Sequence, residues 1–400
     1  MRYSTVFAKT EKIDPKDAVI ANHKLLVRGG FIDQLMAGSW TLLPMGWRVI
    51  TKITQVVREE MNNTGAQEML MPLMHPKEIW NETGRWDSAS EVMYQLKDSR
   101  KKEFALSFTH EEIVMDLIRK HVKSYKDLPV AIYHFSTKFR NEARPQGGIL
   151  RGREFLMKDL YSAHATEEGM AEYYEKVSEA YIRIFERLGF EVYTTEAAGG
   201  VFTDKHTREF QVVAEAGEDT IYVKPGTRQA FNKEVFDGNE AEYEMKRSIE
   251  VGNIFPFGDK NYAEKMGGFY TDKDGTRKLV HFASYGIGIT RLLGTLVEVN
   301  HDDKGIIWPE TVAPFAVHLV EINKSAEEIY RKLIGAGIEV LWDETDRGAG
   351  EKLGNADLLG IPVRLIVSEK TGDKIEWKRR NSEEKELLDI DEVLKRLQNK

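Results

Sequence analysis

The sequence predicts an α+β domain built on an antiparallel sheet, followed by a small α/β domain. Residues 130–141 and 151–162 have the composition of strands and flank a segment rich in glycine, as expected for an antiparallel pair. Residues 167–188 have the apolar spacing of a long helix and end before Gly189. After residue 314, short apolar runs alternate with helical segments, which is typical of a largely parallel sheet.

Length and composition narrow the class of protein. A chain of 400 residues with 41% hydrophobic residues has room for two or three domains with sizeable cores. The absence of cysteine excludes disulfides and thiolate metal sites. The N-terminus is charged from residue 2, and no apolar run reaches the ~18 residues of a membrane span. We therefore expect a cytoplasmic protein outside the membrane, and the net charge of −8 argues against a DNA-coating protein.

The first 75 residues are expected to be mostly helical, with one strand. Residues 18–63 read as helix interrupted by a turn at 43–46, and Thr51 to Met61 carries apolar residues at helical spacing. Residues 68–74 read as a short apolar strand containing Pro72. Because proline removes a ladder donor, this strand is expected at a sheet edge or an interface, where a second subunit could cover it.

The segment Phe108-Thr109-His110-Glu111-Glu112 precedes a predicted helix over 111–122. Thr109 as N-cap and Glu112 three residues later would form a capping box. That arrangement would leave Glu111 to bind a cation such as a substrate amine. The chain has no HExxH and no other histidine pair at metal-ligand spacing, so we expect no zinc site.

The stretch FRNEARPQGGILRGREFLMKD, residues 139–159, holds four arginines, three of them on two predicted strands and one in the loop at 143–150 that joins the strands. Residues two apart on a strand share a face. The groups expected to share a face are Arg140 with Glu142, and Arg151 with Arg153 and Phe155. Guanidinium groups bind phosphate oxygens in bidentate fashion, and an aromatic ring can stack on a base. Alone, the stretch is equally compatible with a solvated, salt-bridged surface hairpin.

A third segment, HFASYGIGITRLLG at 281–294, joins a predicted strand to a helix over 290–299 through Gly286 and Gly288. Glycines allow a ligand to approach the backbone, and a helix N-terminus favours anions. Arg291 stands where a dinucleotide fingerprint has its third glycine, so a Rossmann site is not expected. Close packing of helix on strand is the plain alternative.

The last part of the chain looks like a separate module. A charged segment at 301–313 reads as a linker. The predicted strands are 315–320, 337–341 and 363–367, and the predicted helices are 326–334 and 351–359. Residues 314–400 contain 18 acidic and 15 basic residues, so RNA binding here would rest on local contacts and not on bulk charge.

In this order, the segments resemble motifs 1, 2 and 3 of class II aminoacyl-tRNA synthetases, and more narrowly the bacterial type of prolyl-tRNA synthetase. The segments that carry the narrower resemblance are 28–50, 65–72, Thr109–Glu111, 153–162, 249–258 and 356–367. The resemblance spans nearly the whole chain. It implies a class II catalytic domain at 1–300, the linker at 301–313 and an anticodon-binding domain at 314–400. A short connection at about 217–247 replaces the editing insertion that many bacterial members carry.

The resemblance implies ligation of proline to tRNA(Pro), with ATP and Mg²⁺, by a homodimer formed through residues 55–74. It implies a proline subsite of Thr109, Glu111, Arg140, Asn253, Phe255 and Ser284. It implies an ATP subsite of Arg140, Glu142, Arg151, Phe155, Glu250, Gly288 and Arg291. Arg140 and Arg291 would be catalytic, and Glu250 could contact the Mg²⁺. The tRNA candidates are Arg144, Asp343, Arg347, Lys352, Asn355 and Asp357, for which a solvated helix face is an equal alternative.

The chain departs from the family pattern in places, and other functions would require other residues. Arg144-Pro145-Gln146-Gly147-Gly148 stands where the family usually has RPRFG, and Ser284 stands where a cysteine is common. A non-catalytic paralogue that binds an amino acid or RNA would be expected to have lost Arg140, Glu142 or Arg291, and all three are present. A threonyl enzyme would need a cysteine zinc ligand, and the histidyl pocket motifs are not evident.

Overall fold

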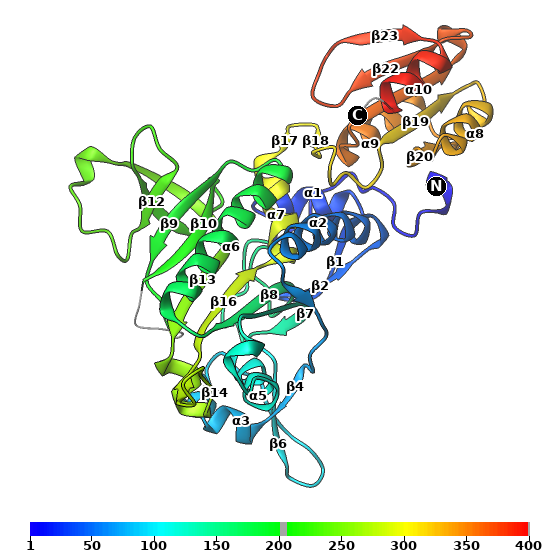
Figure 1. The fold of residues 1–400 in the computed structure, drawn as a ribbon. Helices are drawn as coiled ribbons and strands as arrows, with labels where there is room; N and C mark the ends of the chain where they lie inside the picture. Colours follow the sequence, from blue (N-terminus) through cyan, green and yellow to red (C-terminus); the bar gives the residue numbers. More distant parts are fainter. Residues whose placement is uncertain (201–205, 399–400) are drawn as a thin grey trace. The chain divides into compact units, whose positions relative to one another are not determined.

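The structure, a computed structural model, describes residues 1–200 and 206–398. The described chain forms two compact units. The central unit comprises residues 36–39 and 54–295, and the terminal unit comprises residues 1–35, 40–53 and 296–400. Each unit has its own sheet and core (Figure 1).

The central unit is built on a nine-stranded sheet with the order β10-β9-β12-β11-β13-β16-β8-β7-β3. Its strands are β3 (Gln67–Glu68), β7 (Val130–Phe139), β8 (Glu154–His164), β9 (Val192–Ala197), β10 (Thr207–Val213), β11 (Asp219–Val223), β12 (Gln229–Asn232), β13 (Glu244–Gly258) and β16 (His281–Ile287). The neighbours β7, β8, β16 and β13 pair antiparallel, and only β3 with β7 and β12 with β9 pair parallel. The predicted antiparallel α+β core is confirmed.

Smaller elements surround this sheet. They are β4 (Met74–Pro76), β5 (Gln95–Lys97) and β6 (Glu103–Leu106) in one three-stranded sheet, β14 (Phe269–Thr271) with β15 (Arg277–Leu279), and the helices α3 (Lys77–Asn81), α4 (Arg85–Ser88), α5 (Glu111–His121) and α6 (Glu167–Arg187). α6 begins at Thr166, whose hydroxyl accepts a bond from the Gly169 amide, and it ends before Gly189 in the left-handed region. The predictions for α5 and α6 are confirmed.

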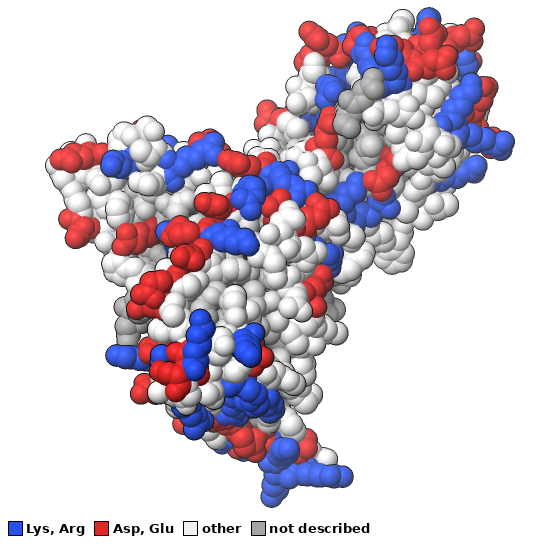
Figure 2. Space-filling view, in the orientation of Figure 1, with Lys and Arg blue, Asp and Glu red and all other residues white. Residues whose placement is uncertain are grey.

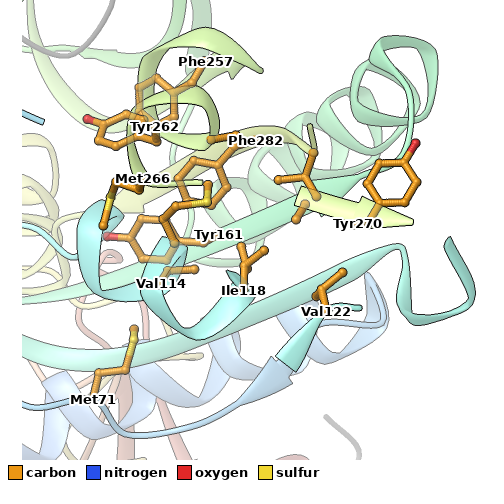
Figure 3. Close-up of a cluster of buried hydrophobic side chains, with 14 residues drawn as sticks. Met71, Val114, Ile118, Val122, Tyr161, Phe257, Tyr262, Met266, Tyr270 and Phe282 are labelled. Carbon is orange, nitrogen blue, oxygen red and sulfur yellow. The ribbon is translucent and has the colours of Figure 1, made fainter. Parts of the chain in front are cut away.

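Helix α5 packs against the sheet through a buried aromatic and aliphatic cluster (Figure 3). Val114 and Ile118 of α5 contribute to the cluster together with Tyr161 of β8 and Phe282 of β16, whose rings stack at 6.0 Å. All four side chains are at most 3% exposed. Burial of this size is worth ~2 kcal/mol per side chain and fixes the first turn of α5 next to β8.

Predictions for the first part of the chain are partly confirmed and partly wrong. Residues 18–63 are mostly helical, as predicted, but a hairpin of β1 (Ile32–Met36) and β2 (Ser39–Leu42) separates α1 (Ala21–Arg28) from α2 (Pro44–Asn63). The turn predicted at 43–46 is instead the start of α2, since proline at a first helical position loses no hydrogen bond. The strand predicted at 68–74 is shorter: β3 ends at Glu68, and Pro72 lies outside any strand. β3 does lie at the sheet edge, as predicted.

The terminal unit contains a five-stranded sheet with the order β20-β19-β21-β22-β23. Its elements are β17 (His301–Asp302), β18 (Gly305–Ile306), β19 (Val317–Ile322), α8 (Glu327–Gly335), β20 (Val340–Asp343), α9 (Ala349–Leu359), β21 (Val363–Ser368), β22 (Ile375–Arg379), β23 (Lys385–Leu388) and α10 (Ile390–Gln398). Helix α7 (Ile289–Val299) follows β16 and leads to them. The predicted parallel strands β20, β19 and β21 are confirmed, whereas the antiparallel β22 and β23 and helix α10 were not anticipated.

Buried histidines predict how stability responds to pH. Burial lowers the pKa of His75, His164 and His318 to about 4, against about 6.5 in an unfolded chain. Protons therefore bind the unfolded chain better, and stability that is full above pH 6.5 is lost as the pH falls toward 4. Each histidine should cost ~2 kcal/mol of unfolding free energy between about pH 7.5 and about pH 5.

Urea unfolding of the wild type and of His318→Leu at several pH values checks this expectation. His318→Leu should be less sensitive to acid than the wild type, whereas His301→Gln, at an exposed position, should not differ from it. An unchanged pH slope in His318→Leu would contradict the account.

Candidate active site

One cavity of about 490 Å³ in the central unit collects the residues predicted for the proline and ATP subsites. Its walls include Thr109, Glu111, Arg140, Glu142, Arg151, Phe155, Glu250, Asn253, Phe255, Ser284, Gly288 and Arg291. These side chains come from segments up to 182 positions apart in the sequence, from Thr109 to Arg291. The structure therefore brings the whole predicted set together, while the role of each residue stays a prediction.

Sheet pairing explains why these segments meet. On β8, Phe155, Met157, Asp159 and Tyr161 alternate along the strand and all line the cavity, because residues two apart share a face. Lys158 points to the other face, where its ammonium contacts the hydroxyl of Tyr181 on α6. α6 thus covers the face of the sheet opposite the cavity. Across β13 and β16, Phe255 pairs with Ser284 and Asn253 with Gly286.

The arginines of the 139–159 stretch are not on strand faces, which corrects the sequence interpretation. β7 ends at Phe139 and β8 begins at Glu154, so Arg140, Arg151 and Arg153 lie in the connection between them. The ladder ends at the pair Phe139–Glu154, although Arg140 N still donates to Arg153 O at 2.9 Å. Gly147 and Gly148 adopt positive φ in the loop beyond it. Within the connection, Arg151 pairs with Glu142 and Glu218, each at 2.8 Å.

Two arginines, Arg140 and Arg291, line the cavity. Arg140 is half-buried, its guanidinium lies 5.3 Å from the Phe155 ring, and its Nε is buried without a hydrogen-bond partner among the described residues. Burial, together with the nearby Arg291, lowers the pKa of Arg140. Arg291 is itself held by the carbonyl of Leu150 at 2.9 Å and the carboxylate of Glu250 at 3.1 Å. A half-buried guanidinium with no carboxylate partner among the described residues is suited to an anion.

The cavity wall also carries a buried carboxylate. Glu111 is 3% exposed, and its Oε2 accepts bonds from Thr109 Oγ1 at 2.6 Å and from Arg85 Nη1 at 3.1 Å. The predicted capping box is wrong, because His110 is the N-cap of α5 and the Thr109 hydroxyl is directed to Glu111. Glu112 accepts bonds from Thr83 and Arg85 instead of capping the helix. The alternative role of Glu111, an anion facing the cavity, fits this geometry.

More acidic groups lie beside Arg291. Glu209 and Asp219 line the cavity near Glu250, and Gln211 Nε2 bridges both, at 2.9 Å each. Burial and the charge of Glu250 raise the pKa of Glu209 to about 8. Carboxylate oxygens are the ligands that Mg²⁺ prefers, but among the described residues these three carboxylates do not form a group at metal-ligand spacing.

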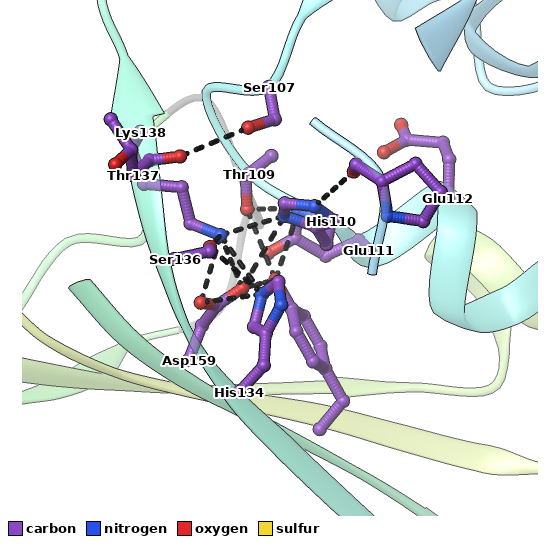
Figure 4. A network of polar contacts seen from close by, with 12 residues as sticks. Ser107, Thr109, His110, Glu111, Glu112, His134, Ser136, Thr137, Lys138 and Asp159 are labelled. Atoms are coloured by element: carbon purple, nitrogen blue, oxygen red, sulfur yellow. Dashed lines mark hydrogen bonds and ion pairs between the residues drawn. The ribbon is translucent and has the colours of Figure 1, made fainter. Parts of the chain in front are cut away.

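A buried polar network lies beneath the carboxylate wall (Figure 4). The ammonium of Lys138 lies 2.7 Å from His110 Nδ1, 3.1 Å from His134 Nε2 and 2.9 Å from Asp159 Oδ2. Burial alone would raise the pKa of Asp159, but the charges of Lys138 and His134 lower it well below its usual range. His110, His134 and Asp159 have the spacing of metal ligands, yet the Lys138 ammonium takes the place of a cation among them.

Several residues that line the cavity or contact a lining residue were missed by sequence reasoning. Asp159 and Tyr161 could have been found by continuing the two-residue period from Phe155 along β8. Arg85 and Glu209 gave no usable signal, because their place at the site depends on long-range packing of α4 and β10.

The tRNA candidates have mixed positions. Arg144 is exposed in the β7–β8 connection and is not among the residues that line the cavity. Arg347 pairs with Glu351 at 2.9 Å, Asn355 accepts a bond from Thr10 at 2.8 Å, and Asp357 pairs with Arg364 at 2.8 Å. Figure 2 shows acidic and basic side chains intermingled on the face drawn.

Two of these candidates are core residues, which corrects the prediction that they contact RNA. Asp343 is 0% and Lys352 is 3% exposed, and Lys352 Nζ donates to the carbonyls of Glu321 at 2.8 Å and Asp343 at 3.2 Å. A side chain buried in this way cannot reach a base without opening the core. Their contribution is to the stability of the terminal unit.

Lys352→Ala should therefore destabilise the terminal unit by ~3–5 kcal/mol, because it leaves the Asp343 carboxylate buried without its nearest cation. Arg347→Ala removes a half-exposed pair one turn apart at the start of α9 and should cost much less, ~0.5 kcal/mol. Thermal unfolding of both variants measures the difference. Equal stability of the two would refute a buried structural role for Lys352.

With the geometry in place, comparison with known proteins decides the family. Residues 94–300 match the family described as tRNA synthetase class II core domain (G, H, P, S and T), and residues 311–400 match the anticodon binding domain family. The chain is 39% identical to a proline–tRNA ligase of Rhodopseudomonas palustris strain TIE-1, over 99% of the chain and 100% of the relative. The chain belongs to the prolyl-tRNA synthetase family. A proline–tRNA ligase of Agrobacterium fabrum is also 39% identical, over 98% and 99% of the two chains.

The fold agrees with this family. A prolyl-tRNA synthetase from Cryptosporidium parvum, solved with halofuginone and AMPPNP, matches with a TM-score of 0.78 over 94% of this chain and 77% of that chain. At 19% identity this match speaks for the fold alone. The full-length match to relatives of similar size fits a member of the prolyl-tRNA synthetase family without an editing insertion. Among the described helices, none has the length and apolar character needed to span a membrane.

Proposed function

We propose that the chain ligates L-proline to tRNA(Pro) in two steps, with ATP as the energy source. The observation that carries the proposal is a single cavity lined both by the Arg140 guanidinium and by the buried Glu111 carboxylate, which interact electrostatically. Proline is a zwitterion whose carboxylate and ring ammonium need these two partners. The full-length likeness to proline–tRNA ligases supports the same substrate.

In the first step, a carboxylate oxygen of proline attacks the α-phosphorus of ATP. The bond to the bridging oxygen breaks, and prolyl-adenylate and pyrophosphate form. Arg140 would hold the proline carboxylate and the α-phosphate together, and charge stabilisation of this kind is the main protein contribution to phosphoryl chemistry. Thr109 and Glu111 would bind the ring ammonium, with Asn253, Phe255 and Ser284 around the ring.

The nucleotide would occupy the other half of the cavity. Phe155 offers a ring for the adenine, Glu142 an acceptor for its amino group, and Arg151 and Arg291 positive charge for the outer phosphates. Arg151 now pairs with Glu142 and Glu218, and Arg291 pairs with Glu250. On binding of ATP, the two arginines would give up these bonds for bonds to the phosphates. Mg²⁺ bound with ATP would neutralise phosphate charge, and Glu250 would supply an oxygen ligand for it.

In the second step, a ribose hydroxyl of the terminal adenosine of tRNA attacks the prolyl carbonyl carbon, and AMP leaves. Arg144, which is exposed, would contact the acceptor stem. We assign the catalytic domain to residues 1–300 and anticodon binding to residues 314–400, with Arg347 and Asn355 as remaining contact candidates. Bases of an anticodon are read by hydrogen bonds and stacking, which does not require a basic domain.

We also propose a cytoplasmic homodimer formed through residues 55–74. Leu70 is 81% and Met74 is 57% exposed, which is unusual for large apolar side chains next to a sheet edge.

Light scattering of the purified protein should give the mass of two chains, and Leu70→Asp should shift the measured mass toward that of one chain. A monomeric wild type at micromolar concentration would refute the dimer.

Charging of a tRNA(Pro) transcript with labelled proline tests the overall function. We expect prolyl-tRNA to accumulate with purified protein, ATP and Mg²⁺, and not with a tRNA(Thr) transcript. A non-catalytic paralogue is the competing candidate, and it would bind the tRNA without charging it.

A further inference from the structure

Arg85 is a buried arginine that joins two neighbouring carboxylates at the start of α5. It begins helix α4 and is 7% exposed. Its Nη1 lies 3.1 Å from Oε2 of Glu111 and 3.1 Å from both carboxylate oxygens of Glu112, and it donates to the Tyr262 hydroxyl at 2.9 Å. One nitrogen thus bridges two side chains that adjacent helical positions would normally point apart.

Aromatic rings hold the guanidinium in place. Its carbon lies 5.0 Å from the ring of Phe108, 5.5 Å from that of Trp80 and 5.7 Å from that of Tyr262. The rings of Phe108 and Trp80 are stacked at 5.1 Å and are both at most 1% exposed. A planar cation between rings gains cation–π attraction and loses little freedom on binding a carboxylate. The position of Arg85 is therefore fixed by packing that lies outside the cavity.

The charges around Arg85 do not balance. Glu111 and Glu112 are 3% and 0% exposed, and one guanidinium faces both. Burial raises the pKa of Glu112, while Glu111 lines the cavity and also accepts the Thr109 hydroxyl. Glu112 is anchored on its other side by Thr83 Oγ1 at 2.7 Å. Glu112 therefore acts as the fixed anchor of Arg85, and Glu111 is the group that Arg85 orients toward the cavity.

We propose that Arg85 is a positioning residue for amino acid selection, which fixes the Glu111 carboxylate to receive the ring ammonium of the substrate. Arg85 does not line the cavity and acts through Glu111. This inference rests on the proposed function, since it assumes an amino acid whose ammonium meets Glu111. It extends the amine subsite from Thr109 and Glu111 to a residue 26 positions earlier in the chain.

The test is ATP–pyrophosphate exchange with proline, measured for the wild type, Arg85→Met and Arg85→Lys. Methionine keeps an apolar stem between the rings and removes the charge, whereas lysine keeps the charge and loses the planar fork. For Arg85→Met the KM for proline should rise about 10- to 100-fold, the range for residues that orient a ligand group. The KM for ATP should stay within about two-fold, and Arg85→Lys should fall between Arg85→Met and the wild type.

Two controls separate positioning from general damage. Arg119→Gln removes another arginine ion pair on α5, to Glu82 and Asp116, and should leave both KM values unchanged. A double-mutant cycle with Glu111→Gln asks whether Arg85 acts through that carboxylate. In the Glu111→Gln background, Arg85→Met should change kcat/KM for proline by less than about three-fold.

The outcomes are distinct. A lower kcat with unchanged KM values in both Arg85 variants would show that Arg85 has only a structural role. The same conclusion would follow if Arg85→Met lowered kcat/KM for proline as much in the Glu111→Gln background as in the wild type. If Arg85→Met does not fold, Arg85→Lys provides the test: its KM for proline should rise while its KM for ATP stays unchanged. A wild type that exchanges with proline while the Arg85 variants behave normally overturns this inference only. A folded wild type without proline exchange overturns the proposed function and this inference with it.

Discussion

Arg140→Ala is expected to lose at least about 10²- to 10³-fold in the rate of prolyl-adenylate formation while keeping its fold. In the proposed reaction, Arg140 contacts both the proline carboxylate and the α-phosphate, and the charge on their oxygens changes as the new bond forms. Its buried Nε has no partner among the described residues, so its removal leaves no protein group unpaired. It also relieves the repulsion from Arg291 that contributes to the lowered pKa of Arg140.

The melting temperature of Arg140→Ala should therefore equal or exceed that of the wild type, a combination typical of residues retained for activity at a cost in stability. Arg228→Ala, which removes an exposed pair with Glu186, is a matched control for loss of an arginine. Exchange at near-normal rate in Arg140→Ala, or unfolding of that variant at room temperature, would contradict the assigned role.

Glu111→Gln is expected to raise the KM for proline by about 10²- to 10³-fold, because it removes one member of a buried charge pair with the substrate ammonium. Glutamine is nearly isosteric and keeps an oxygen that can accept from Thr109 and Arg85. The KM for ATP should change little, since the nucleotide half of the cavity is formed by other segments.

Proline-dependent and ATP-dependent exchange curves measure the two constants of Glu111→Gln separately. Glu175→Gln changes an exposed carboxylate on α6 that pairs with Arg208, and it should behave like the wild type. Equal rises in both KM values would show that Glu111 supports the cavity as a whole and does not bind the amine.

The sequence predicted the fold where local periodicity and tertiary packing agree. The long helix α6 has a strong apolar stripe, an N-cap at Thr166 and a glycine stop, so its limits were visible without the structure. The hairpin of β1 and β2 was hidden, because its residues read equally well as a continuation of the flanking helices. β3 was overextended, since apolar composition does not reveal where pairing with β7 ends.

The residues of the candidate site could be predicted from the sequence, but their positions in the fold could not. Arginines, a carboxylate and a phenylalanine in the 139–159 stretch indicated an anion site, but the ladder ends earlier than expected and the arginines lie in the connection. The Thr109–Glu112 segment has the sequence pattern of a capping box, but no capping box forms. Arg85 donates to Glu112 instead, and His110 is the N-cap of α5. Such long-range pairs cannot be found from spacing along one chain.

Proline-dependent exchange of pyrophosphate into ATP tests the central claim most directly, because it reports the first step without tRNA. The purified chain, supplied with ATP, Mg²⁺ and each amino acid in turn, should exchange with proline far faster than with alanine, threonine or histidine. Absence of exchange with proline, or faster exchange with threonine or histidine, would contradict the account.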